Sequence, residues 1–411
     1  MSKKDKTPLV AKLRFPKFQN EGPISFKNGD DVFEPISNKK HNADLPVLAI
    51  TQDYGAIPRD LIDLNVSVTD KSVQNYKVVE IGDFIISLRS FQGGIEYSMY
   101  EGICSPAYIV LRKKIPVDEL YYKYYFKTSK FIQDLNKDIE GIRDGKMISY
   151  NQFSSLLLPM PDIKEQQKIA DCLSSLDDLV TAEDKKLEAY KARKKGLMQK
   201  LFPAEGKTVP EWRFPEFGGG KEWEEKKLGQ IADVLMCKRI FAEQTNDKEG
   251  IPFYKIGTLG AKPDTFISKE LFEEFKSKYN YPRKGEILIT CSGTVGKCLP
   301  YNGQDAYYQD SNIVWIDNPT LEISNDLLLH LLLNVDWKQL NSTTITRIYG
   351  SDLRNLSIIF PEDKGEQQKI ADCLTSMDSL IIAQSQKIEA LSNHKKGLMQ
   401  GLFPSADEVS V

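Results

Sequence analysis

The sequence has few of the residues that metal-dependent or redox chemistry requires. Only three histidines occur among 411 residues, His41, His330 and His394, and none has a second type of ligand at zinc spacing. The six cysteines form no Cys-x-x-Cys pair, which favours buried free thiols in a reducing compartment. No apolar run is long enough to cross a bilayer, and no signal peptide is evident. These absences predict a soluble, cytoplasmic protein without a metal site.

A strong excess of charge is missing as well. The formal net charge is -3 and the pI is about 5.9, which does not by itself indicate a nucleic-acid-binding protein. Any DNA-binding surface is therefore expected to be local, or to be shared with partner proteins.

The motifs of common enzymes are also lacking. Residues 293–297, GTVGK, resemble a phosphate-binding loop, but they lack both the four-residue gap and the Ser or Thr after the lysine. Asp162, Glu165 and Lys168 have the residue types of a nuclease cluster, yet a helix cap explains the two acidic residues. Since no methyl-donor loop or catalytic triad is found either, we expect a chain that catalyses nothing by itself and holds no cofactor.

What the sequence does contain is a long internal repeat. Residues 165–203 and 366–404 align without a gap and are identical at 25 of 39 positions, including EQQKIADCL and KKGLMQ. Such self-similarity indicates a duplicated chain.

Each copy has apolar residues at steps of three and four, with polar residues interrupting the pattern at the same two places. This heptad pattern predicts a long helix with an apolar seam. One copy alone would be read as an ordinary core-facing helix, but two like seams most simply pack on each other, antiparallel about a pseudo-twofold axis. The predicted seam residues are Ile169, Leu173, Leu176, Val180, Leu187, Tyr190 and Leu197 in the first copy, and Ile370, Leu374, Met377, Ile381, Ile388, Leu391 and Leu398 in the second.

Signals for helix ends flank both copies. An Asp-x-x-Glu capping box is predicted before each helix, at Asp162–Glu165 and Asp363–Glu366. Proline ends each helix because it cannot continue one, and one glycine in each copy is a possible weak point. The prolines are Pro203 and Pro404, and the glycines are Gly196 and Gly397.

The repeat unit is larger than the helix, because the motif RFPxF occurs at residues 14–18 and again at 213–217. Strands are expected at 47–51, 84–88, 108–111 and 156–158, and in the second half at 253–256, 287–290, 313–316 and 356–360, with helices at 117–135 and 326–340. Glycine-marked loops at Gly145 and Gly350 lead to the last strands. We therefore predict an α+β protein in which two β-rich domains, each with a mostly antiparallel sheet, alternate with two long helices that form an antiparallel coiled coil.

The predicted domain boundaries follow from this plan. They are an N-terminal lead-in at 1–20, a first domain at 21–161, a first long helix at 162–203, a second domain at 204–361, a second long helix at 362–404, and a tail at 405–411.

Loops next to the predicted strands carry side chains suited to bases and phosphates. Arg and Lys pair with guanine, Gln pairs with adenine, and hydroxyl groups bind phosphate. For any single residue, an ordinary polar loop position remains the alternative. The candidates are Tyr54, Arg89, Ser90, Phe91, Gln92 and Tyr97 in the first domain, and Lys238, Arg239, Ser292, Thr294, Lys297, Tyr308 and Gln309 in the second.

The whole pattern resembles the specificity subunit of type I restriction-modification systems. The doubled EQQKIADCL and KKGLMQ motifs carry the resemblance, together with RFPxF and the segments 90–98, 236–241, 287–296 and 308–315. It implies that each domain recognises one half of a bipartite site in double-stranded DNA and that the helices act as spacers. It further implies that two methyltransferase subunits with S-adenosylmethionine methylate adenine, and that a restriction subunit uses ATP and Mg²⁺ for translocation and cleavage.

Two other hypotheses remain open at this stage. One is a scaffold whose two modules bind protein or carbohydrate, which would show no sequence-selective DNA binding even with partners. The other is an independent enzyme, which would show turnover by the purified chain.

Overall fold

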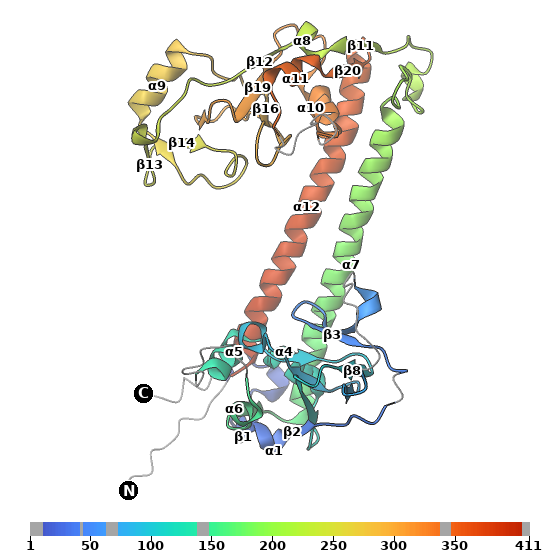
Figure 1. Cartoon of the computed structure of the whole chain (residues 1–411), viewed down its shortest axis with the longest axis vertical. Coiled ribbons are helices and arrows are strands. Elements are labelled where there is room, and N and C mark those ends of the chain that lie inside the picture. The colour runs from blue at the N-terminus through green and yellow to red at the C-terminus, as the bar shows by residue number, and fades with distance from the viewer. Residues whose placement is uncertain (1–10, 42–43, 63–72, 138–147, 338–346, 405–411) are drawn as a thin grey trace. The chain divides into compact units, whose positions relative to one another are not determined.

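The computed structural model describes residues 11–41, 44–62, 73–137, 148–337 and 347–404 (Figure 1). The chain divides into two compact units, one formed by Met1–Asp184 and Gln386–Val411 and the other by Lys185–Ser385. Both divisions fall inside the two long helices, so each unit contains a part of each helix.

The two long helices are α7 (Ile163–Leu201) and α12 (Lys364–Leu402), with 39 residues each. Both run through their internal glycines without interruption. The first helix is capped by Asp162, whose Oδ1 accepts a hydrogen bond from the Lys164 amide at 2.9 Å. The second is capped by Asp363, whose Oδ1 accepts from the Glu366 amide at 3.0 Å. The predicted long helices are therefore confirmed.

The glutamates of the two predicted capping boxes have a different role, so this part of the prediction is wrong. Glu165 accepts two hydrogen bonds from Arg14 of the first RFPxF motif, each 2.7 Å long. Glu366 accepts the equivalent pair from Arg213 of the second motif. A guanidinium group offers two charge-assisted donors in a fork that matches a carboxylate, which a single backbone amide cannot equal. The lead-in motif and the helix start are thus parts of one buried joint.

A second joint depends on the middle residue of the EQQ motif. The buried Gln166 side chain accepts from the amide of Asp118 at 3.0 Å and donates to the carbonyl of Pro161 at 2.9 Å. Gln367 repeats this arrangement in the second unit by accepting from the amide of Ser324 at 2.8 Å. Asp118 and Ser324 are themselves the N-caps of domain helices. Each glutamine therefore ties the start of a long helix to the start of a domain helix.

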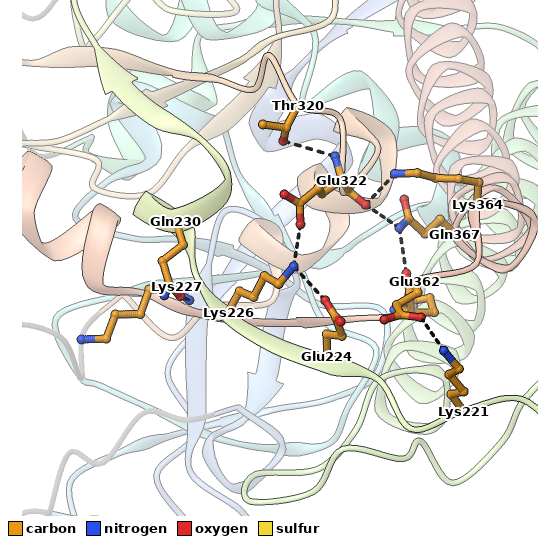
Figure 2. A network of polar contacts seen from close by, with 11 residues as sticks. Lys221, Glu224, Lys226, Lys227, Gln230, Thr320, Glu322, Glu362, Lys364 and Gln367 are labelled. Carbon is orange, nitrogen blue, oxygen red and sulfur yellow. Dashed lines mark hydrogen bonds and ion pairs between the residues drawn. The ribbon is translucent and has the colours of Figure 1, made fainter.

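Figure 2 shows the contacts around Gln367 in the second unit. The Gln367 amide and the Lys364 ammonium both donate to the carbonyl oxygen of Glu322, at 2.8 and 2.6 Å. The Glu322 carboxylate in turn accepts from Lys226 at 2.6 Å, and Lys226 also pairs with Glu224. The network fixes the second domain to the first turn of α12.

Two ion pairs between the long helices show that they run antiparallel in the first unit. In the first unit Asp177 of α7 pairs with Lys395 of α12, and Glu183 pairs with Lys387 at 2.5 Å. Residue numbers rise along one helix while they fall along the other, as in the predicted coiled coil. In the second unit Lys194 pairs with Asp378 at 2.6 Å, which is the equivalent of the Asp177–Lys395 pair in the repeat.

A different side chain contacts the equivalent aspartate in each unit. The Tyr124 hydroxyl donates to Asp177 Oδ2 at 2.7 Å in the first unit. In the second unit His330 lies 3.9 Å from Asp378 and contacts Thr375 Oγ1 at 3.1 Å through Nε2. The His330 side chain is buried, and its Nδ1 has no hydrogen-bond partner among the described residues. Burial, and then the charge of Lys194, lower the pKa of His330 below its ordinary value.

The first domain is built from short strands and helices. The strands are β1 (Ser25–Asn28), β2 (Phe33–Ile36), β3 (Leu48–Thr51), β4 (Gly55–Pro58), β5 (Lys77–Val79), β6 (Phe84–Ile86), β7 (Glu96–Tyr97), β8 (Gly102–Cys104), β9 (Ile109–Lys113) and β10 (Leu157–Met160); the helices are α1 (Gly29–Val32), α3 (Ser90–Gly93), α4 (Glu119–Tyr125), α5 (Ser129–Asn136) and α6 (Tyr150–Ser154). The strands form one antiparallel sheet of order β2-β9-β6-β7 and the pairs β1-β10, β3-β4 and β5-β8.

The second domain repeats this plan with additions. Its strands are β11 (Glu224–Lys227), β12 (Asp233–Leu235), β13 (Thr245–Asn246), β14 (Ile251–Tyr254), β15 (Phe266–Ile267), β16 (Ile287–Thr290), β17 (Cys298–Pro300), β18 (Tyr307–Tyr308), β19 (Ile313–Asp317) and β20 (Ser357–Phe360); its helices are α8 (Leu228–Ile231), α9 (Lys269–Lys278), α10 (Asn325–Leu333) and α11 (Gly350–Asn355). One sheet has the order β12-β19-β16-β17, equivalent to that of the first domain, and another has the order β13-β15-β14-β18. Only β14 and β18 pair in parallel among the described strands.

The core of each unit joins the domain to both long helices. In the first unit an aromatic cluster around Phe33, Phe84 and Phe126 packs with Leu173 of α7 and with Phe403, which follows α12. In the second unit, residues 370, 371 and 374 of α12 and residues 198 and 201 of α7 pack against strands β16 and β19. Burial of this apolar surface is the main stabilising contribution to each unit.

The sequence predictions of local structure were accurate for the main strands and less so for helix ends. The strand predicted at 287–290 is observed with these bounds, and the other predicted strands are found within a few residues. The single helix predicted at 117–135 is wrong, because Thr128 caps a new helix by accepting from the Phe131 amide. The helix predicted at 326–340 ends at Leu333, although residues 338–340 lie outside the described residues. Each domain also divides its strands among several sheets, whereas the sequence predicts one sheet in each.

Several predicted features fall outside the described residues. They are the loop at Gly145, the tail at 405–411 and the first ten residues of the lead-in.

Candidate nucleic-acid interface

The candidates of the first domain lie on two neighbouring loops. Tyr54 stands in the turn between β3 and β4 and is 66% exposed. Arg89 precedes α3 and is exposed, as is Gln92 within that helix, while Phe91 is half-buried. The Gln52 amide reaches the carbonyl of Arg89 at 3.5 Å, which links the two loops. The structure therefore brings together Tyr54, Arg89 and Gln92 as accessible side chains.

Two predicted candidates are buried, so the structure does not support them as DNA contacts. Ser90 is 1% exposed, and its Oγ accepts from the Ser87 amide at 2.9 Å. Tyr308 is 4% exposed and stacks on Tyr254 with ring centroids 6.0 Å apart. A small hydroxyl fits a turn as a backbone cap, and an aromatic ring fits an apolar core. Sequence alone does not separate these uses from binding.

A hollow of about 670 Å³ lies beside Tyr54 in the first unit. Its lining includes Tyr97, Lys123, Lys127 and the exposed Met99. Burial raises the pKa of Tyr97, so its phenol keeps its proton at neutral pH. Burial raises the pKa of Glu96 as well, although the Lys127 ammonium 2.6 Å away opposes this shift. The hollow therefore offers aromatic faces next to the loop of Tyr54, and its lining contains three lysines and three acidic residues.

The second unit has a cleft of about 400 Å³, whose lining includes residues of β13 and β14 and of the loops that follow β12 and β18. The predicted candidates Arg239 and Gln309 both line it. Its lining also contains polar residues that were not among the sequence candidates, including Lys255, Asp310, Asn312 and Arg347. Lys255 directly follows β14 and Arg347 precedes the loop at Gly350, but neither has a sequence pattern that distinguishes it from an ordinary loop residue.

The other candidates of the second domain lie outside this cleft. Lys238 is exposed and lies over the ring of Tyr279, 5.5 Å from its centroid. Ser292 donates to Asn312 Oδ1 at 2.7 Å and thereby orients an amide of the cleft. Lys297 is half-buried and donates to the carbonyl of Leu259, whereas Thr294 is exposed. Of these four residues, Ser292 is connected to the cleft, because its hydrogen bond orients the Asn312 side chain.

Within the described residues, no cluster of three or more His, Cys, Asp or Glu side chains could hold a metal ion. In the same part of the chain, no helix has both the length and the apolar character that a membrane crossing requires. Burial raises the pKa of Cys104, Cys237 and Cys298 to about 12, which leaves these thiols protonated and weakly nucleophilic.

The predicted seam residues are all buried or half-buried in the structure. The polar residues that interrupt the apolar pattern lie along the same face of each helix as the seam residues. Lys194 and Lys395 form the ion pairs with aspartates described above, and Gln384 is buried.

Two units with the same sheet order, a shared pair of antiparallel helices and differently lined clefts define a duplicated α+β binding protein. The chain belongs to the family of type I restriction modification DNA specificity domains, since the family model matches residues 25–190 and again 220–393. The two matches correspond to the two repeats.

Individual relatives agree with this assignment. A protein of Haemophilus influenzae with the name "putative type I restriction enzyme specificity subunit S.HindORF215P" is 46% identical over 154 residues, which are 38% of this chain and 40% of that protein. The MjaVIII type I restriction enzyme specificity subunit of Methanocaldococcus jannaschii is 24% identical over 359 residues, which are 82% of this chain and 81% of that protein.

Solved structures of similar fold include the S subunit of a type I restriction-modification system from M. genitalium. It aligns with 96% of this chain and 99% of its own, with a TM-score of 0.57 and 15% identity. A structure from work on assembly and conformational transition of the type I R-M system has the same TM-score at 16% identity, covering 92% of this chain and 97% of its own. At this level of identity the likeness concerns the fold, and it confirms the predicted fold class.

Proposed function

We propose that this chain is the non-catalytic, sequence-specific DNA-recognition subunit of a type I restriction-modification complex in the cytoplasm. Each unit recognises one half of an asymmetric, bipartite DNA site. The observation that carries the proposal is the duplication of one sheet order, β2-β9-β6-β7 and β12-β19-β16-β17, under two different sets of exposed loop side chains. A scaffold that is retained while its binding residues differ is suited to recognising two unlike sequences.

The long helices are proposed to set the distance between the two half-sites. Each helix begins in one unit and ends in the other, so its length determines the number of residues that link them. Removing one heptad shortens a helix by about 10 Å and leaves the seam in phase.

The helices are further proposed to bind two methyltransferase subunits. Near the start of each helix, one row of surface positions is the same in both copies, whereas residues 174, 178 and 181 all differ from their equivalents 375, 379 and 382. The shared row contains a leucine that is 40% exposed in one copy and 46% exposed in the other. Identical rows on two copies, each exposed except at its cysteine, fit two copies of one partner. The rows are Lys168, Cys172, Ser175, Leu179 and Ala182, and Lys369, Cys373, Ser376, Leu380 and Ala383.

The chemistry of the complex is assigned to these partners. S-adenosylmethionine belongs to the methyltransferase subunits, which methylate adenine after it leaves the base stack. ATP and Mg²⁺ belong to the restriction subunits that translocate and cleave DNA.

The decisive experiment maps methylated adenines in DNA treated with the reconstituted methyltransferase complex. Replacing residues 21–161 by the first domain of another family member should change one half-site and leave the other half-site unchanged. Deleting residues 182–188 together with residues 383–389 should shorten the spacer without changing either half-site. A change in the sequence of both half-sites, or the absence of sequence-selective binding in the wild-type complex, would contradict the proposal and favour a scaffold for other ligands.

A second experiment tests the partner surface. Leu179→Asp should weaken binding of one of the two methyltransferase subunits by about tenfold or more, and Leu380→Asp should weaken binding of the other, because a buried leucine anchor would become a desolvated charge. Thr181→Asp is the matched control, since residue 181 is exposed but differs between the copies. Equal effects of all three variants on a pull-down with the methyltransferase would refute this surface.

A further inference from the structure

The cleft of the second unit is more positive than the chain as a whole. Three cationic residues, Arg239, Lys255 and Arg347, line it together with one carboxylate, that of Asp310. The full chain has a net charge of -3, so this excess of positive charge is local. Such a concentration of cations in a concave surface favours an electronegative ligand such as DNA.

The Arg347 side chain has a donor that no other described residue uses. Its Nη2 donates to the carbonyl of Ser311 at 3.2 Å, and its guanidinium lies 5.6 Å from the ring centroid of Tyr349. Its Nε is buried and has no partner among the described residues. A buried donor without an acceptor costs free energy, so a ligand that lets this side chain reorient would relieve the cost.

A strained turn at Ser311 lies next to Arg347 in the lining of the cleft. Ser311 has a φ of 59°, a conformation that is uncommon for a residue with a side chain. The turn places Asp310 so that its Oδ2 accepts from Arg239 Nε at 2.8 Å. The Arg239 side chain is 59% exposed and that of Asp310 is 14% exposed. Strain of this kind is commonly retained where the side chains that it positions have a role in binding.

This arrangement places a donor group and an acceptor group side by side at the cleft. With its Nε engaged by Asp310, Arg239 still has both of its terminal nitrogens available as donors. Guanine presents two acceptors, N7 and O6, in the major groove, and the paired cytosine presents its N4 amino group as a donor. The Arg239–Asp310 pair is thus complementary to the edge of one G·C base pair.

We propose that Arg239 and Asp310 together recognise a single G·C pair in the half-site that the second unit binds. Arg239 donates to guanine and Asp310 accepts from cytosine N4, while Arg347 and Lys255 attract the adjacent backbone. The inference rests on the proposed DNA-recognition function and adds to it the base pair and the residues that specify it.

The test measures binding of the complete methyltransferase complex to duplexes in which each position of both half-sites is varied in turn. Arg239→Ala should lose roughly 10- to 100-fold in affinity for the cognate site, and it should remove the base preference at one G·C position. Asp310→Asn should relax the preference at that same position. Arg239→Lys should keep most of the overall affinity but lose discrimination, because an ammonium does not reproduce the guanidinium fork.

Arg283→Ala is the matched control. Arg283 is 61% exposed and pairs with Glu286 and Asp317, but it does not line the cleft. It should leave base preference unchanged, and a thermal melt of each variant checks that the second unit is folded.

Three results would overturn the inference while leaving the proposed function intact. The first is a uniform loss of affinity for all DNA sequences, with a weaker salt dependence of binding. The second is that the Arg239 and Asp310 variants change base preference at different positions of the site. The third is that Arg239→Ala and Arg283→Ala have the same base-preference profile. A uniform loss would make Arg239 a phosphate contact. A wild-type complex without any sequence preference would instead refute the proposed function itself, and the inference with it.

Discussion

The buried joint between Arg213 and Glu366 predicts a large and unit-specific loss of stability. The side chains are 11% and 1% exposed, and Arg213 Nη1 also donates to the carbonyls of Gly220 and Lys221, at 3.1 and 3.0 Å. Arg213→Ala leaves a buried carboxylate without its partner and two carbonyl groups without a donor. Breaking a buried pair from one side costs about 3 to 5 kcal/mol, a large part of the 5 to 15 kcal/mol of a typical domain.

For a unit of this size, such a loss corresponds to a fall in Tm of about 6 to 20 °C. Calorimetry would measure the fall in Tm, and peptide-resolved hydrogen exchange would show which unit loses stability. Arg213→Ala should destabilise the second unit, and Arg14→Ala should destabilise the first. Replacing both members of the second pair, as in Arg213→Met with Glu366→Leu, should restore most of the stability because no charge remains buried.

The exposed pair of Lys221 and Glu362, 3.3 Å apart and visible in Figure 2, is the control. Because these side chains are 86% and 48% exposed, Lys221→Ala should cost at most about 1 kcal/mol. If Arg213→Ala cost no more than Lys221→Ala, the joint would not have the stabilising role that we assign to it.

Further predictions concern pH, backbone conformation and packing. The folded pKa of His330 is lowered, so the unfolded chain takes up a proton first as pH falls; the second unit should lose stability below about pH 6.5, and His330→Tyr should lose less between pH 7.5 and 5.5 in thermal melts. Equal losses in both proteins would refute this. Gly94→Ala should destabilise the first unit by more than about 1 kcal/mol in urea titration, because φ is 79° and a Cβ would lie 2.0 Å from the Phe126 carbonyl oxygen. Gly196→Ala, where a Cβ meets open space inside α7, should instead stabilise by about 0.5 to 1 kcal/mol; the same sign for both glycine variants would contradict the structure. Leu374→Ala should cost about 2 to 5 kcal/mol by calorimetry, since Leu374 is fully buried, and a cost below 1 kcal/mol would place it outside the core.

The sequence alone determined the features that arise from local periodicity and from duplication. A repeated heptad pattern requires an apolar face, and two such faces bury most area by packing on each other, so the long helices and their antiparallel pairing could be predicted. The main strands followed from short runs of β-branched residues between turn residues, as in Ile287–Thr290. A local pattern contains this information because it depends on neighbours along the chain.

Only the tertiary structure decided how residues far apart in sequence share their hydrogen bonds. Glu165 and Glu366 have the spacing of capping boxes, yet each binds an arginine about 150 residues away. The same holds for the cleft, where Arg239 and Asp310 approach each other through the pairing of β12 with β19 and the turn at Ser311. Ser90 and Tyr308 were chosen by residue type and proved to be buried, because exposure depends on the packing of the whole domain and residue type alone does not specify it.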